Sequence, residues 1–172
     1  MRSIGATEGN SYDDRKRDLR SYYAQFGRRP LNDSAVWSLS LADSTLPEGH
    51  IGYRAWITYV AGIPTHCVEL QRWSVGLGAT ASRMRPKRGQ RARQYVEGYK
   101  PAWGRQASLD GLNIALFGAP AVPTLNARSE EFGVHHQTYR KVRDLVAGAV
   151  LLQMWQYEDA LDWAVRTQRR AA

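Results

Sequence analysis

The sequence predicts an all-α fold with one or two helix-turn-helix units and a long C-terminal helix. Apolar residues recur at helical spacing along much of the chain, and glycine or proline follows these stretches where helices would end. Its 172 residues, 43% of them hydrophobic, suffice for one core. We expect a flexible leader at 1–10, a helical region at 11–106 with a basic segment at 83–105, and the helix-turn-helix and long helix at 107–172.

The first helix is expected at residues 11–26. Ser11 is placed to cap this helix, and Asp14 stands three residues later at the reciprocal position of a capping box. Gly27 stands where a helix-ending glycine belongs, and Pro30 prevents the helix from continuing.

Residues 36–41 fit two patterns. Apolar residues alternate with serine there, which suits a short strand, but the apolar residues within 35–39 suit a helix equally well. We favour the helix because Asn32 or Asp33 could cap its start.

Two helices are expected on either side of Gly62. The first is apolar, covers roughly 50–61 and ends at Gly62; Ile63, Pro64 and Thr65 follow, and the second helix runs through about residue 75. Pro64 suits the first turn of the second helix because its missing N–H would be unpaired there.

The segment 83–105 is strongly basic, and Glu97 is its only acidic residue. Its basic residues are Arg83, Arg85, Lys87, Arg88, Arg91, Arg93, Lys100 and Arg105. Tyr95, Tyr99 and Trp103 are four residues apart, which predicts one stripe on a helix that belongs to the core rather than to a base-stacking platform. We expect an exposed loop at 84–90 and, for the segment, a surface that faces nucleic acid or polymerase; the alternative is a solvated face.

The C-terminal third is predicted to hold a short helix and a long one. The short helix covers 108–117 and is stopped by Gly118, and the long helix runs from about 136 to 168. Residues 145–152 are apolar on nearly every side, which implies burial all round or a second chain packed against them.

The stretch between these helices carries a helix-turn-helix pattern. Such a corner needs a small residue in the first helix, a glycine four residues later and apolar anchors in the second helix. Ser129, Gly133 and Val134 fill the first positions, and Tyr139 and Val142 are the anchors. The residues left pointing outward or capping are His135, His136, Gln137, Thr138, Arg140, Lys141 and Arg143. The alternative is a helical hairpin with a solvated polar face.

A weaker copy of this pattern centres on Gly62. Thr58 takes the small position, Ile63 the first anchor and Val68 the second. It is less basic, and its first helix is largely core material, so an ordinary helical hairpin is the favoured interpretation there.

Charge indicates the class of partner. The chain carries 24 Lys and Arg against 16 Asp and Glu, a net charge of +8, and arginine suits phosphates and guanine edges. We expect double-stranded DNA as a partner, contacted by Gln137, Thr138, Arg140, Lys141 and Arg143, with Arg83, Arg85, Lys87, Arg88, Arg91 and Arg93 adding phosphate contacts.

Other classes of protein, such as membrane proteins, secreted proteins, metalloproteins and enzymes, find less support in the sequence. No run approaches the ~18 apolar residues of a membrane span, and the N-terminal stretch has no secretory signal. The single Cys67 and the adjacent pair His135 and His136 lack metal-site spacing, so neither metal nor cofactor is expected. Without a nucleophile elbow, phosphate loop or paired catalytic carboxylates, we predict a cytoplasmic protein that is not an enzyme.

The C-terminal third resembles the end of phage late-gene antiterminators of the Q type, in their metal-free branch. The residues in common are Ser129, Gly133, Val134, Thr138, Tyr139, Arg140 and Arg143, within about 35 residues. The resemblance implies binding to a promoter-proximal DNA element and to bacterial RNA polymerase, which is modified to read through terminators.

The sequence therefore predicts a DNA-binding transcription regulator, with antitermination as the narrower form and RNA polymerase as a second partner. The alternative is a helical protein–protein module, such as a phage-encoded inhibitor of a host protein. The long C-terminal helix is a candidate homodimer interface, and no membrane partner is expected.

Overall fold

The computed structural model describes residues 33–60, 66–84 and 96–171, and every regular element within them is helical. The predicted all-α class and the long C-terminal helix are thereby confirmed. The elements are α2 (Asp33–Ser44), α3 (Gly52–Val60), α4 (Cys67–Arg83), α5 (Pro101–Phe117), the 3₁₀ turn η2 (Ala119–Ala121), α6 (Leu125–Phe132) and α7 (His136–Ala171). The expected helix at 11–26 lies outside the described residues.

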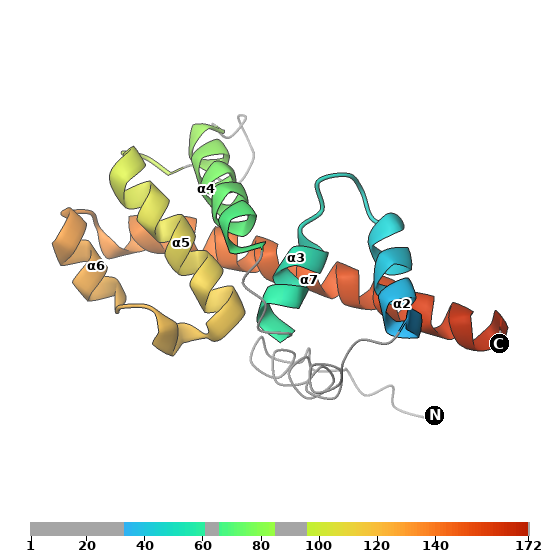
Figure 1. Ribbon diagram of the computed structural model, residues 1–172. Helices are drawn as coiled ribbons and strands as arrows, with labels where there is room; N and C mark the ends of the chain where they lie inside the picture. The colour runs from blue at the N-terminus through green and yellow to red at the C-terminus, as the bar shows by residue number, and fades with distance from the viewer. Residues whose placement is uncertain (1–32, 61–65, 85–95, 172) are drawn as a thin grey trace, which may run out of the picture.

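Helix α7 is the axis of the molecule (Figure 1). The other helices pack along it, with α6 and α5 near its N-terminal end, α4 and α3 further along, and α2 near its C-terminus. Tyr139 of α7 lies in a cluster with α5, Met154 lies in a second cluster with α3, α4 and α5, and Leu161 lies in a third with α2 and α3. One long helix therefore supplies side chains to all three clusters of the core.

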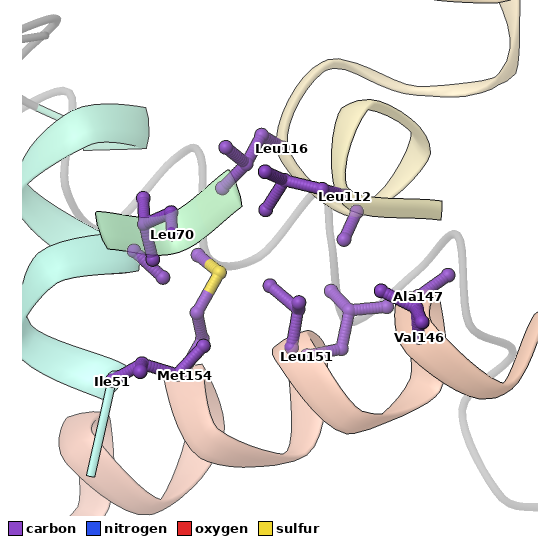
Figure 2. Packing of buried hydrophobic residues seen from close by; sticks show 11 residues of the cluster. Ile51, Leu70, Leu112, Leu116, Val146, Ala147, Leu151 and Met154 are labelled. Carbon is purple, nitrogen blue, oxygen red and sulfur yellow. The ribbon is translucent and has the colours of Figure 1, made fainter. Parts of the chain in front are cut away.

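The middle cluster answers the question raised by the apolar run at 145–152. Figure 2 shows Val146, Ala147, Leu151 and Met154 on one side of this cluster, facing Leu70 of α4, Leu112 and Leu116 of α5, and Ile51, which directly precedes α3. These residues belong to the same chain, so Val146, Ala147, Val150 and Leu151 of the run are buried without a second copy. Leu152 is half exposed, and Gly148 is exposed as well.

Glycines allow the helices to approach closely. A Cβ on Gly78 of α4 would collide with the Ser108 hydroxyl of α5, and a Cβ on Gly111 of α5 would collide with the backbone oxygen of Arg143 in α7. Helix α4 continues to Arg83, past the end expected near residue 75, because it tolerates Gly78, a residue that weakens a helix locally but that the close contact with α5 requires.

At three other places the observed helices either differ from the predicted bounds or decide between two predicted alternatives. Residues 36–41 lie in α2, so the helical interpretation is confirmed and the strand is wrong. Helix α5 begins at Pro101 instead of 108, because proline occupies its first turn after an extended Lys100. The division expected between 106 and 107 falls inside this helix.

The aromatic stripe predicted for 95–103 is not helical as a whole. Tyr99 precedes α5, and Tyr95 lies outside the described residues. Tyr99 and Trp103 nevertheless meet, with ring centroids 5.0 Å apart, and Trp103 is buried in the cluster with Tyr139. These two aromatic rings belong to the core, as expected.

Candidate nucleic-acid interface

The corner between α6 and α7 has the geometry that the sequence predicted for a helix-turn-helix. Thr124 caps α6 by accepting a hydrogen bond from the backbone N–H of Ala127 at 3.3 Å. Gly133 ends the helix in the left-handed region, with φ 60° and ψ 32°. Ser129 closes the turn, because its carbonyl accepts from the N–H of Val134 at 3.2 Å and its hydroxyl donates to the Val134 carbonyl at 2.6 Å.

The predicted anchors of the second helix lie in the core. Tyr139 and Val142 are buried, and Val134 and Phe132 pack against the same cluster. The rings of Phe132 and Tyr139 are nearly parallel, with centroids 6.3 Å apart. The core thus holds one side of the start of α7, which leaves its opposite side to solvent.

A buried acidic residue, Asp110 of α5, connects three helices at this corner. Arg128 of α6 donates to its carboxylate through Nε at 2.8 Å and through Nη2 at 3.0 Å. From α7, Tyr139 donates its hydroxyl at 2.7 Å, and Gln106 of α5 donates its amide at 2.9 Å. Both carboxylate oxygens are therefore paired, as a buried charge requires.

The electrostatics favour one protonation state for this cluster. Burial raises the pKa of Tyr139, and the hydrogen bond that Tyr139 donates to Asp110 raises it further. The hydrogen bond to the same carboxylate raises the pKa of Arg128, which also donates to Glu131 at 2.7 Å. Tyr139 therefore stays a neutral donor and Arg128 stays charged, so this network holds the corner in one orientation relative to α5.

Sequence reasoning missed both Asp110 and Arg128. The available signal was the one charged residue in the largely apolar stretch 108–117, because an acidic residue on a core face needs a buried basic or hydroxyl partner. That signal identifies Asp110 but not its partner, since Arg128 lies 18 residues away on another helix.

The outward side of α7 carries most of the predicted ligands. Gln137, Arg140 and Lys141 are exposed, and Thr138 is half-buried. Arg143 differs from the expected outward orientation, because its side chain is only 16% exposed. The structure therefore offers Gln137, Arg140 and Lys141 to a partner more directly than Arg143.

An acidic residue that the prediction did not consider lies among these side chains. Asp144 accepts from Arg140 at 3.0 Å and from Arg143 at 2.7 Å. Arg140 remains 62% exposed, so its charge is paired at the surface rather than buried inside the fold. Lys141 is exposed as well.

The net charge of the chain comes from outside the described helices. Residues 33–60, 66–84 and 96–171 contain twelve Lys and Arg and twelve Asp and Glu. The excess of +8 therefore lies in 1–32 and 85–95. The corner is nearly balanced too, with four basic and three acidic residues in 124–148.

Most of the predicted basic segment cannot be placed against this corner. Arg85, Lys87, Arg88, Arg91 and Arg93 lie outside the described residues, whereas Arg83 is exposed at the end of α4. Val96, which lies within the segment 83–105 and beyond Arg93, is buried in the cluster that contains Tyr139 and Val142. At Val96 the basic segment therefore contacts the core of the α6–α7 corner.

The second helix-turn-helix expected around Gly62 is corrected at one anchor. Val68 is 57% exposed, whereas Leu70 is buried and takes the core position. Thr58 is buried as the pattern requires, but Gly62 and Ile63 lie outside the described residues. Helix α4 begins at Cys67, later than expected, and the side that carries Leu70 packs against the core.

Comparisons with known proteins assign this chain to no family. No family model, curated protein or solved structure matches the chain. Within the described residues, none of the helices combines the length and the apolar character needed to cross a membrane. The same residues contain no group of three His, Cys, Asp or Glu side chains arranged to hold a metal ion.

Proposed function

We propose that this protein is a DNA-binding transcription regulator that places the start of α7 in a major groove. The observation that supports the proposal is the α6–α7 corner. There Gly133 is left-handed, Tyr139 is buried and Arg140 is exposed. This arrangement presents a polar helix face in the way that DNA-binding helix-turn-helix units present theirs.

The exposed residues have complementary roles in this proposal. Gln137 near the start of α7 offers an amide that suits adenine, and Arg140 and Lys141 suit phosphates or guanine. Arg140 must exchange Asp144 for a phosphate. An exposed ion pair of this kind contributes only about 0.2–1 kcal/mol, so the exchange is inexpensive in free energy.

In this proposal, different parts of the chain make different contributions to DNA binding. The corner carries little net charge, so its role is to orient the protein on the duplex and to contact base edges. The basic residues of 83–93 and 1–32 would supply most of the non-specific attraction to phosphates. An antiterminator that also binds bacterial RNA polymerase is the narrower form, and it rests on the resemblance of the segment that contains Ser129, Gly133 and Arg143.

Fluorescence anisotropy with a random-sequence duplex at two salt concentrations tests the proposal. We expect binding at low salt that weakens steeply as salt rises, and an affinity loss of about tenfold in Arg140→Ala with Lys141→Ala, as two phosphate contacts would give. The matched control is Arg72→Ala with Arg169→Ala, which removes two exposed charges away from the corner. Equal losses in both double variants would show a general charge effect and contradict a role for the α7 face.

A helical protein-interaction module, such as a phage-encoded inhibitor of a host protein, is the second candidate. The observation that favours it is the set of exposed large apolar side chains, which includes Trp37, Phe117 and Trp163. A pull-down from bacterial lysate with and without nuclease separates the two candidates. Recovery of a partner that survives nuclease, together with no binding to duplex at low salt, would favour the module.

A further inference from the structure

The C-terminal part of α7 presents a stripe that the core does not use. Asp159, Trp163, Arg166 and Arg170 are all exposed, and they are separated by four, three and four residues. This spacing places them on one face of the helix and is the spacing of a coiled-coil seam. Trp163, at 50% exposed, is a large apolar surface in the centre of that stripe.

The charges of this stripe are arranged so that it complements itself. Asp159 precedes Trp163, and both arginines follow it. When two such helices cross antiparallel about the point between residues 164 and 165, Asp159 of each meets Arg170 of the other. The same register places Trp163 of each opposite Arg166 of the other, a pairing that favours a cation–π contact. A parallel arrangement would bring like charges together.

These side chains have little else to bind within the described part of the chain. Asp159 and Arg170 form no ion pair there, and Arg166 makes only a long one, 3.9 Å, to Asp162 one turn away. More apolar surface lies at the same end of the molecule, because α2 packs near the C-terminal end of α7 (Figure 1). There Ser38 of α2 donates to Gln168 of α7 at 2.8 Å. The neighbours of Ser38 in sequence, Val36 and Trp37, are both exposed.

We propose that residues 159–170 of α7 form an antiparallel contact with the same residues of a second copy of this chain. The overlap is about 18 Å long on each helix, which is short for a stable interface, so the dimer should form in the micromolar range. The contact needs no nucleic acid and lies far along α7 from the corner at Gly133, so it stands apart from the proposed function (Figure 1).

Sedimentation equilibrium of the full chain, free of nucleic acid and across the micromolar range, tests the dimer. We expect Trp163→Ala to raise the dimer dissociation constant at least about tenfold, as loss of a central aromatic residue does. The matched control is Phe117→Ala, because Phe117 of α5 is 51% exposed but lies on another helix. This control should leave the dissociation constant unchanged.

Charge reversal tests the register. One variant carries Asp159→Arg, and the other carries Arg170→Asp. Each should be monomeric alone because like charges then face each other, whereas a mixture of the two should form a heterodimer because the charges are complementary again. Recovery in the mixture also shows that both variants fold.

Several results would overturn the proposal. The first is a wild-type chain that stays monomeric at high micromolar concentration. The second is a chain whose mass increases only when a different partner is present. A dimer that is unaffected by Trp163→Ala, or charge-reversed variants that do not pair when mixed, would overturn it as well.

Discussion

The hydroxyl of Tyr139 donates a 2.7 Å hydrogen bond to the carboxylate of Asp110, and this contact joins the start of α7 to the middle of α5. The same carboxylate receives two hydrogen bonds from Arg128 of α6. The orientation of the proposed recognition helix therefore depends on a polar cluster behind it, and the side chains that would meet DNA lie on the opposite face.

Removal of the central carboxylate should destabilise the protein strongly. Asp110→Ala leaves the partly buried Arg128 without its main partner and the buried Tyr139 hydroxyl without an acceptor, so we expect the free energy of unfolding to fall by about 3–5 kcal/mol. Urea denaturation measures this loss. The control is Glu130→Gln, an exposed change on α6 that should alter the same free energy by no more than about 0.5 kcal/mol. Similar values for the two variants would contradict the role assigned to Asp110.

The left-handed turn at Gly133 should tolerate asparagine better than alanine. A Cβ at this position meets nothing within 4 Å, so the cost of a substitution is one of backbone conformation alone. We expect Gly133→Ala to lower the free energy of unfolding by about 1–2 kcal/mol and Gly133→Asn to lower it less, since asparagine adopts the left-handed region more easily. Thermal unfolding of both variants checks the order, and an alanine variant as stable as wild type would contradict the turn geometry.

Gly111 should be sensitive for a different reason. A Cβ there meets the backbone oxygen of Arg143 and the side chain of Val146, so α5 and α7 would have to move apart. We expect Gly111→Ala to cost more than Gly133→Ala, about 2–3 kcal/mol, despite the better helix propensity of alanine. Gly148 of α7 is the matched control, because a Cβ there meets nothing and Gly148→Ala should stabilise the helix. A stabilising effect at Gly111 would show that the helices are not in close contact.

Alkaline pH should destabilise the fold through its buried tyrosines. Burial, with the hydrogen bond to Asp110, raises the pKa of Tyr139 above its ordinary value of 10.0, and burial raises the pKa of Tyr157 as well. The folded state thus holds these protons more tightly than the unfolded state does. Their contribution is fully present below pH 10 and is lost as the pH rises above it, while the unfolded tyrosines ionise.

Urea denaturation at a series of pH values from neutral to alkaline checks this dependence. We expect Tyr139→Phe to make the decline above the ordinary tyrosine pKa shallower, because one of the two linked groups is gone. At neutral pH the same variant should lose about 1.5–3 kcal/mol, the value of a hydrogen bond to a charged group. An unchanged alkaline slope would mean that Tyr139 is accessible to solvent.

Much of the fold was predictable because its signals are local. Gly118 at the end of α5 and Gly133 at the end of α6 act within one turn of their own positions. The apolar periodicity of α7 spans more than thirty residues, so its helical state and its anchors Tyr139 and Val142 were visible in the sequence. The turn at Gly133 required only the spacing from Ser129.

Other features depend on residues that are distant in sequence, and the sequence does not say which of them meet. Val68 was expected in the core and is exposed, because the other helices pack against the side of α4 that carries Leu70. Arg143 was expected to point outward, but its side chain, which pairs with Asp144, is only 16% exposed. Both predictions depended on which side of the helix each residue faces. A shift of one residue along an α-helix changes that direction by about 100°.

By itself the sequence determined the all-α class, the corner at Gly133 and the position of the excess charge, since each of these follows from neighbouring residues or from composition. Only the tertiary structure decided that Asp110 holds Arg128 and Tyr139, and that Trp163 stays outside the core. The physical reason is that the burial of a side chain depends on which helices pack around it, and that packing joins segments separated by many residues of chain.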